Sequence, residues 1–345
     1  MIGIGVIGYG YWGPNLVRNF METSDVAVRA VCDRDPKRQA LAKARCPLAN
    51  VTSDPRDLLK DSSIDAIVIA TPVSSHYELA MAALEAGKHV LVEKPMTTTS
   101  EEAARLVEKA AAKNKVLMVD HTFIYTGAVR KMKELIVQKT LGDVLYYDSV
   151  RVNLGLFQHD VNVLWDLAPH DLSIMQYLLS EAPTAVSALG MSHVPGQPEN
   201  IAYLTLLYDR ALLAHLHVNW LAPVKVRRTL IGGAQKMIVY DELEGSEKVK
   251  VYDSGVEVEE ATGQPSERRY QMLIGYRTGD MHAPKVDNTE ALKVETAHFR
   301  DCIAHSQKPL TSGELGLQVV QVLECAAMSM QRQGRPIKIA TREAV

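Results

Sequence analysis

The sequence has few cysteines and no long hydrophobic run. Its 4 cysteines, among 345 residues, lie far apart and form no C-x-x-C pair, which excludes a disulfide framework and a cysteine-rich zinc site. No apolar stretch reaches the roughly 18 residues that a membrane span requires. The first apolar run also lacks the preceding basic segment of a signal peptide. We therefore expect reduced, buried thiols, no membrane association and a cytoplasmic protein.

The sequence also lacks an excess of charge of one sign. Its 38 Lys and Arg residues nearly balance its 41 Asp and Glu residues, and neither sign forms a long block, so we expect no nucleic-acid partner. The 11 histidines show no H-E-x-x-H or similar spacing, so we expect no metal site. The composition is that of a globular protein, and the length favours two domains.

Short apolar runs rich in β-branched residues alternate with amphipathic segments over the first third of the chain. This alternation is typical of βαβ units with a parallel sheet. We predict strands at Ile2 to Ile7, Val26 to Cys32, Ala66 to Ala70, His89 to Val92 and Val116 to Val119. We predict helices at Trp12 to Met21, Pro36 to Ala44, Pro55 to Leu59, Ser75 to Ala86 and Ser100 to Lys113. Residues 1–120 are therefore predicted to form a doubly wound α/β domain that binds a dinucleotide.

The pattern changes after residue 120, where polar and apolar residues alternate in longer segments separated by Pro and Gly. We predict strands at Asp143 to Leu154, Ala185 to His193, Ala202 to Asp209, Leu213 to Trp220, Arg227 to Ile231 and Lys236 to Tyr240, and helices at Gly127 to Thr140, Leu167 to Leu179, Glu290 to His305 and Glu314 to Gln333. Residues 121–345 are thus predicted to form an α+β domain whose large, mostly antiparallel sheet has one open face. The polar segment from Asp253 to Asp287 is predicted to be a loop.

The first predicted strand runs into a glycine-rich turn, Gly8-Tyr9-Gly10-Tyr11-Trp12-Gly13. Gly8 permits a tight turn, Gly10 lets a pyrophosphate approach the backbone, and Gly13 lets the next helix pack closely. Asp33 follows at the end of the second predicted strand, where a carboxylate can accept hydrogen bonds from the adenosine ribose. A glycine turn alone would be weak evidence, but the strand, the helix and Asp33 together predict a dinucleotide site.

Asp33 also bears on the choice of cofactor. A carboxylate at this place repels a 2′-phosphate and accepts a free 2′-hydroxyl, which favours NAD over NADP. Arg34, with Lys37 and Arg38 close in sequence, would reduce this repulsion if the basic side chains lie near Asp33. The alternative is that they belong to a solvated helix start. We expect NAD, with NADP as the less favoured cofactor.

Two further strand ends carry polar residues. One is followed by Thr71-Pro72, with His76 at the start of the next helix, and the other by Glu93-Lys94-Pro95. Both lie at the carboxyl edge of the predicted sheet, where doubly wound folds bind ligands. Pro95 restrains the backbone of Lys94 to extended conformations, which predicts that the Lys94 ammonium is held at the crevice. An ordinary exposed lysine is the alternative.

A second constellation, Asp166-Leu167-Ala168-Pro169-His170-Asp171, adjoins an apolar helical run. Asp166 and His170 are four residues apart and share one face if the helix begins this early. Beside an oxidisable alcohol, the carboxylate would orient the substrate and the imidazole would act as general base. The alternative is a helix cap formed by Asp166 or Asp171 beside a histidine without a role.

In their order and separations, these motifs resemble the Gfo/Idh/MocA family of NAD(P)-dependent sugar and inositol oxidoreductases. The resemblance implies a Rossmann domain followed by a domain whose open sheet often mediates oligomers, and hence a dimer or tetramer. It implies that Lys94 bridges the nicotinamide ribose and the substrate hydroxyl, that His170 is the acid or base, and that Asp166 contacts a neighbouring hydroxyl or His170. The residues predicted to bind the cofactor are Gly8, Tyr9, Gly10, Tyr11, Trp12, Gly13, Asp33, Arg34, Thr71, Pro72, His76, Glu93, Lys94 and His121.

One segment departs from the family pattern. Many members carry a Gly-Gly stretch before the aspartate, whereas this chain has Val161-Asn162-Val163-Leu164-Trp165. With the segment Asn153 to Gln158, it resembles the branch that oxidises nucleotide-activated amino sugars at C3. Arg151 would then bind a diphosphate and Asn153 a sugar hydroxyl, unless both are ordinary edge residues. The residues predicted to bind substrate are Lys94, Arg151, Asn153, Trp165, Asp166 and His170.

The predicted function is hydride transfer between NAD and a secondary alcohol of a sugar ring. In its most specific version, the prediction is that the alcohol is at C3 of a UDP-linked N-acetylamino sugar. One alternative is an inositol or free aldose dehydrogenase. Another is a non-catalytic protein that senses NAD, although such a protein would have no need of Lys94, Asp166 and His170 together.

Overall fold

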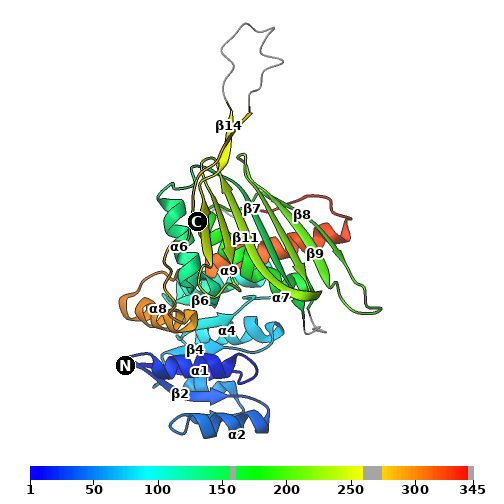
Figure 1. Ribbon diagram of the computed structural model, residues 1–345. Coiled ribbons are helices and arrows are strands. Elements are labelled where there is room, and N and C mark those ends of the chain that lie inside the picture. Colours follow the sequence, from blue (N-terminus) through cyan, green and yellow to red (C-terminus); the bar gives the residue numbers. More distant parts are fainter. Residues whose placement is uncertain (156–160, 259–273, 341–345) are drawn as a thin grey trace. The chain divides into compact units, whose positions relative to one another are not determined.

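The computed structural model describes residues 1–155, 161–258 and 274–340 (Figure 1). The chain divides into two compact units, which are described separately. The first consists of Met1–Thr126, Leu172–Ile174 and Asn288–Cys325, and the second of Gly127–Asp171, Met175–Asp287 and Ala326–Val345. The sequence-based division after residue 120 differs from these units, because residues 121–126, 172–174 and 288–325 belong to the first unit.

The first unit holds a six-stranded parallel sheet in the order β3-β2-β1-β4-β5-β6. Its strands are β1 (Ile2–Ile7), β2 (Val26–Cys32), β3 (Asn50–Thr52), β4 (Ala66–Ile69), β5 (His89–Glu93) and β6 (Leu117–Asp120). The predicted doubly wound fold is confirmed, and only β3, with its 3 residues, was not expected. The strand order reverses between β1 and β4, which is the switch point where such folds bind ligands.

The helices of this unit include some that begin at a side-chain cap and some that do not. They are α1 (Gly13–Glu22), α2 (Pro36–Arg45), α3 (Pro55–Lys60), α4 (His76–Glu85), α5 (Ser100–Ala112), α8 (Ala291–His305) and most of α9 (Gly313–Gln331). Asp35 caps α2 by accepting a hydrogen bond from the amide of Lys37, and Thr99 caps α5 by accepting one from the amide of Glu102. These side chains satisfy amides that a helix leaves unpaired at its start.

The core of the first unit is apolar and includes the C-terminal segment. Val6, Ile67 and Val90 are fully buried in the sheet, and burying each such side chain contributes about 1.5–3 kcal/mol. Phe299 of α8 packs edge-on against Phe20 of α1, with ring centroids 6.2 Å apart. This aromatic contact explains why the segment from residue 288 joins a unit that is otherwise formed by the first 126 residues.

The second unit is built on a nine-stranded sheet in the order β16-β13-β12-β11-β7-β10-β9-β8-β17 (Figure 1). Its strands are β7 (Val144–Leu154), β8 (Ala185–Met191), β9 (Ile201–Leu207), β10 (Leu213–Asn219), β11 (Leu221–Gly233), β12 (Met237–Asp241), β13 (Val249–Tyr252), β16 (Met281–His282) and β17 (Ile337–Lys338). Only β7 and β10 pair in parallel, and the other neighbours are antiparallel. The predicted, mostly antiparallel sheet is confirmed.

The two faces of this sheet differ, as the alternation in β10 predicts. Leu216 and Val218 are fully buried on one face, and that face is covered in part by α7 (Val163–Leu179), whose Met175 lies 3.5 Å from the hydroxyl of Tyr208. On the other face, the ring of Tyr203 stacks on His217 with centroids 4.3 Å apart. The second helix of this unit is α6 (Gly127–Val137).

The structure corrects several predictions for this unit. The strand β11 begins at Leu221 and not at Arg227, and β13 and β17 were not predicted. The helix α7 begins at Val163 and not at Leu167, because the side chain of Asn162 accepts a hydrogen bond from the amide of Trp165 and caps the helix four residues earlier. The segment from Asp253 to Asp287, predicted to be a loop, contains β16 and a separate hairpin of β14 (Gly255–Val258) and β15 (Ile274–Arg277). Residues 259–273 lie outside the described part of the chain.

Candidate active site

The glycine-rich turn after β1 has the shape of a phosphate cradle. A side chain at Gly8 would lie 2.4 Å from the carbonyl oxygen of Ala70, and one at Gly13 would lie 2.1 Å from the carbonyl oxygen of Gly8. At Gly10 an added carbon would meet only the Arg38 guanidinium, at 3.4 Å. Gly8 and Gly13 are therefore required for packing, whereas the space above Gly10 is open to a ligand. This arrangement fits the pyrophosphate of a dinucleotide.

Asp33 follows β2 at the carboxyl edge and is nearly buried. Its Oδ2 accepts a hydrogen bond of 2.7 Å from the amide of Tyr9, and its Oδ1 accepts one of 2.9 Å from the amide of Asp35. Each oxygen keeps a second lone pair for a ribose hydroxyl. Arg38 forms an ion pair with Asp33, since its guanidinium lies 3.8 Å from Oδ2. The side chain of Arg34 is exposed. Arg38, and not Arg34, thus moderates the negative charge.

His76 ties two of the predicted turns together. Its Nδ1 lies 2.9 Å from the carbonyl oxygen of Pro95, and its Nε2 lies 2.8 Å from that of Thr71. Burial lowers the pKa of His76, so the ring is neutral and donates only one of these two bonds. Both ring nitrogens face the protein backbone. His76 therefore braces the Thr71-Pro72 turn against the turn that holds Lys94, and a direct hydrogen bond from His76 to the cofactor has no support in this geometry.

Lys94 and His121 follow adjacent strands. Lys94 comes directly after β5, is partly exposed, and donates its backbone amide to Oε2 of Glu93 at 3.0 Å. His121 comes directly after β6 and is 1% exposed. Burial lowers the pKa of His121 to about 4, and neither ring nitrogen has a hydrogen-bond partner among the described residues. Since an unpaired buried polar group is costly, His121 is suited to pair with a bound ligand.

The second constellation lies on α7 in the second unit. Asp166 and His170 are one helical turn apart, so the shared face that their spacing predicts is present. The cap of α7 is Asn162, which excludes the alternative that Asp166 or Asp171 serves as the cap. Oδ2 of Asp166 accepts a hydrogen bond of 3.0 Å from the indole of Trp220. Asp166 is thereby oriented by a buried residue that the sequence analysis did not single out.

The structure corrects the expected place of Arg151. Its side chain is 3% exposed, and its Nε donates to Oδ2 of Asp171 at 2.6 Å. The guanidinium also lies 3.4 Å from Glu242, and Ser149 donates its hydroxyl to Asp171 at 2.7 Å. Arg151 thus holds Asp171, the residue that follows His170 on α7, and its side chain is not exposed to solvent. The expected contact of Arg151 with a diphosphate has no support.

The remaining predicted substrate residues are partly exposed. Asn153 lies two residues after Arg151 on β7 and so shares its face of the sheet, and Trp165 lies directly before Asp166 on α7. Both side chains are half-buried. Of the segment Asn153 to Gln158, residues 156–160 lie outside the described residues.

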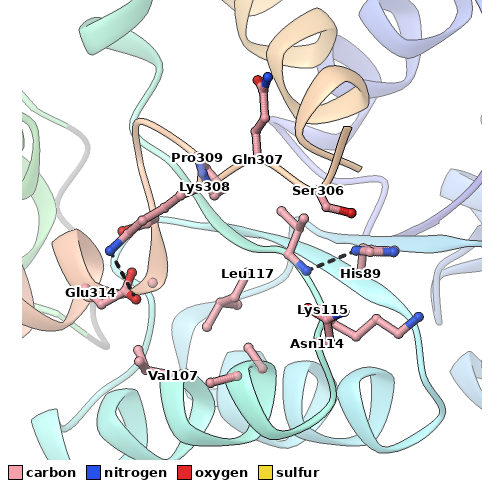
Figure 2. A pocket seen from close by; sticks show the side chains of 15 residues that line it. His89, Val107, Asn114, Lys115, Leu117, Ser306, Gln307, Lys308, Pro309 and Glu314 are labelled. Atoms are coloured by element: carbon pink, nitrogen blue, oxygen red, sulfur yellow. Dashed lines mark hydrogen bonds and ion pairs between the residues drawn. The ribbon is translucent and has the colours of Figure 1, made fainter. Parts of the chain in front are cut away.

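A cavity of about 250 Å³ lies elsewhere in the first unit (Figure 2). It is lined by residues at the amino ends of β5 and β6, such as His89 and Leu117, and by the loop between α8 and α9. Lys308 and Glu314 pair across its wall at 3.4 Å, and burial lowers the pKa of His89 to about 4. The cavity is therefore at the opposite end of the strands from Lys94 and His121.

Other classes of site find no support in the described residues. Within them, no group of three or more His, Cys, Asp or Glu side chains is arranged to hold a metal ion. The four cysteines are free and buried. No helix in this part of the chain is long and apolar enough to cross a membrane.

Comparison with known proteins agrees with this fold. Residues 2–121 match the model of the "Oxidoreductase family, NAD-binding Rossmann fold", and residues 129–239 match the "GFO/IDH/MocA C-terminal domain". The chain is 30% identical over 246 residues to the uncharacterized oxidoreductase YdgJ of Escherichia coli (strain K12), which covers 68% of this chain and 69% of that protein.

Two solved structures share the fold along nearly the whole chain. Levoglucosan dehydrogenase, in a complex with NADH and levoglucosan, superposes with a TM-score of 0.83 at 22% identity, over 99% of this chain and 100% of that one. UDP-N-acetylglucosamine 3-dehydrogenase from Acidithiobacillus ferrooxidans superposes with a TM-score of 0.80 at 23% identity, over 96% and 98%. These likenesses concern the fold. The chain belongs to the GFO/IDH/MocA family of oxidoreductases, and its first unit is an NAD-binding Rossmann domain.

Proposed function

We propose that the protein transfers a hydride between NAD and a secondary alcohol of a sugar ring or polyol. Bound NAD supplies the hydride acceptor. The observation that carries the proposal is the presence of Lys94, Asp166 and His170 in a chain that also has the phosphate cradle around Gly10. A protein that only senses NAD would need the cradle alone.

Each of the three residues has a distinct role in this proposal. The Lys94 ammonium donates a charge-assisted hydrogen bond to the substrate oxygen as negative charge develops there. His170 accepts the hydroxyl proton, since an imidazole exchanges protons near neutral pH. Asp166, oriented by Trp220, contacts a neighbouring hydroxyl or His170. The buried nitrogens of His121, which lack partners among the described residues, are satisfied by bound cofactor.

We expect tighter binding of NAD(H) than of NADP(H), by about tenfold or more, because a 2′-phosphate would meet the Asp33 carboxylate. The variant Asp33→Ser should narrow this gap. The variant Arg38→Ala is a matched comparison that should widen it, because the Arg38 guanidinium lies 3.8 Å from Asp33 and offsets its charge. Fluorescence titrations with NADH and NADPH measure both affinities for the unaltered protein and for the two variants. Equal affinities in the unaltered protein would contradict this preference.

For the substrate, we propose a UDP-linked N-acetylamino sugar, oxidised at C3, with an inositol or free aldose as the alternative. The support is the resemblance of residues 153–158 and 161–165 to the branch that oxidises nucleotide-activated amino sugars. The buried position of Arg151 removes one argument for a diphosphate contact. The substrate class thus rests on the resemblance and needs a direct measurement.

The deciding experiment is a spectrophotometric screen for NADH formation with UDP-N-acetylamino sugars, the corresponding free sugars and inositols. Because remote binding energy positions the reacting carbon, the free sugar should lose kcat/KM by about two orders of magnitude or more relative to its UDP-linked form. Comparable kcat/KM for an inositol or aldose would overturn the substrate proposal. Turnover of none of these compounds would count against the proposed reaction itself.

We also propose a homo-oligomer, a dimer or tetramer, formed through the open face of the nine-stranded sheet. Large apolar side chains gather on that face, and Leu189, Tyr203 and Leu213 are each about half exposed. Covering such side chains removes apolar area from water. Light scattering at micromolar concentration tests this, and a monomeric mass would contradict it.

A further inference from the structure

Trp12 connects the glycine-rich turn to the far side of the parallel sheet. It lies directly before α1, and its indole Nε1 donates a hydrogen bond of 2.7 Å to Oδ2 of Asp120. Asp120 is the last residue of β6, whereas the turn follows β1, and the strands β4 and β5 lie between β1 and β6 in the sheet. The hydrogen bond therefore links the turn after β1 to the end of β6, past the two intervening strands of the sheet.

Asp120 is a fixed acceptor. It is 2% exposed, and its other oxygen, Oδ1, accepts a hydrogen bond from the hydroxyl of Thr122. Its rotation is thus restricted before Trp12 binds. A buried carboxylate that is already held through one oxygen loses little further freedom when its other oxygen accepts from the indole.

Two other acidic residues contact this carboxylate from different elements. Glu93 lies at the end of β5, beside Asp120 in the strand register, and Glu295 comes from α8 and is fully buried. Burial and the nearby charge of Asp120 raise the pKa of both Glu93 and Glu295 well above the ordinary value. Their neutral forms are favoured, so they add little repulsion around Asp120.

The turn is consequently held by carboxylates at both ends. Asp33 accepts from the amide of Tyr9 at 2.7 Å at its start, and Asp120 accepts from the indole of Trp12 at its end. Between them lie Gly10, with open space above it, and Tyr11, which is 92% exposed. A backbone segment that is fixed at both ends and open in the middle presents its amides to a ligand without first having to be ordered.

We propose that Trp12 and Asp120 are positioning residues for NAD, and that their hydrogen bond sets the affinity for the cofactor by holding the turn in its binding conformation. The inference rests on the NAD site of the proposed function. Neither residue takes part in the hydride transfer itself. Loss of the bond should therefore raise the Kd and KM for NAD while kcat at saturating cofactor stays nearly constant.

The test is a double-mutant cycle on the NADH affinity, with Trp12→Phe, Asp120→Asn and the double variant. Phe keeps an aromatic ring but removes the indole N–H donor, together with part of the side-chain volume. Each single variant should weaken NADH binding by about tenfold. The double variant should lie within about twofold of the weaker single one, because the second substitution has no bond left to break.

Thr122→Val is the matched control, since it removes a different hydrogen bond to Asp120 without changing a residue of the turn. It should change the NADH Kd by less than about twofold. NADH binding by Trp12→Phe as tight as that of the unaltered protein, or effects of the two substitutions that simply multiply, would overturn the inference. Failure of the unaltered protein to bind NADH would instead overturn the proposed function, so the two failures can be told apart. If Asp120→Asn does not fold, the pair Trp12→Phe and Thr122→Val still decides the question.

Discussion

Replacing Lys94 or His170 by Ala lowers kcat by about a hundredfold or more and leaves the affinity for NAD within a few fold. A positioned general acid or base contributes about 10²–10⁴-fold to a reaction rate, and a charged donor to a developing alkoxide contributes in the same range. Neither side chain takes part in the phosphate cradle around Gly10. The loss should therefore appear in kcat and kcat/KM for the substrate and not in the cofactor Kd.

Steady-state rates with the substrate found in the screen, together with NADH titrations, measure this expectation. Lys115→Ala and His305→Ala are suitable controls, because Lys115 lies beside the cavity at the amino ends of β5 and β6 and His305 is exposed at the end of α8. Both controls should keep kcat within about twofold. Near-normal turnover by His170→Ala would show that the proton acceptor is another group, with Lys94 as the next candidate.

Lys94→Arg separates charge from geometry at the same position. Arginine keeps the positive charge but presents a planar fork in place of a compact ammonium. If Lys94 acts by donating to one oxygen at a fixed place, Arg should restore little of the lost kcat. Substantial rescue would mean that the positive charge alone is sufficient.

The sequence was sufficient for features that depend on neighbours along the chain. The G-x-G-x-x-G turn, Asp33 at the end of β2, and the four-residue spacing of Asp166 and His170 all follow from local periodicity. The starts of the other helices were also predicted to within one residue, but α7 begins at a cap, Asn162, that lies outside the apolar pattern.

Contacts between distant segments were not predictable in this way. Trp12 and Asp120 are 108 residues apart, and Trp220 and Asp166 are 54 residues apart, so no spacing rule connects them. The assignment of residues 288–325 to the first unit depends likewise on tertiary packing against α1. A short strand such as β3, with 3 residues, is recognisable only by its pairing with β2.

Arg151 illustrates why a charged residue in a promising place can be misassigned. Its position on β7 and its chemistry both suit a phosphate ligand. Whether it is available depends on Asp171, which is 20 residues away, and on Glu242 from the segment after β12. The sequence shows these carboxylates but not that they converge on one guanidinium.

Arg151→Ala should therefore destabilise the protein by about 3–5 kcal/mol, which is typical when one partner of a buried ion pair is removed. Asp171 would keep the hydroxyl of Ser149 but lose its cation, whereas Glu242 would keep its ion pair with Arg227. Urea unfolding followed by circular dichroism measures the change. Arg56→Ala is the matched control, since the side chains of the Arg56–Asp54 pair are 76% and 36% exposed, and loss of such an exposed pair has little effect on stability.

The same variant also separates the two roles considered for Arg151. If Arg151 acts only by holding Asp171, the ratio of kcat/KM for the UDP-linked substrate to that for the free sugar stays unchanged in Arg151→Ala, even where both values fall. If Arg151 instead binds the diphosphate, Arg151→Ala should lose kcat/KM for the UDP-linked substrate selectively. Its free energy of unfolding should then equal that of the unaltered protein. Because the guanidinium is 3% exposed and bonded to Asp171 at 2.6 Å, the expected outcome is the unchanged ratio together with the large loss of stability.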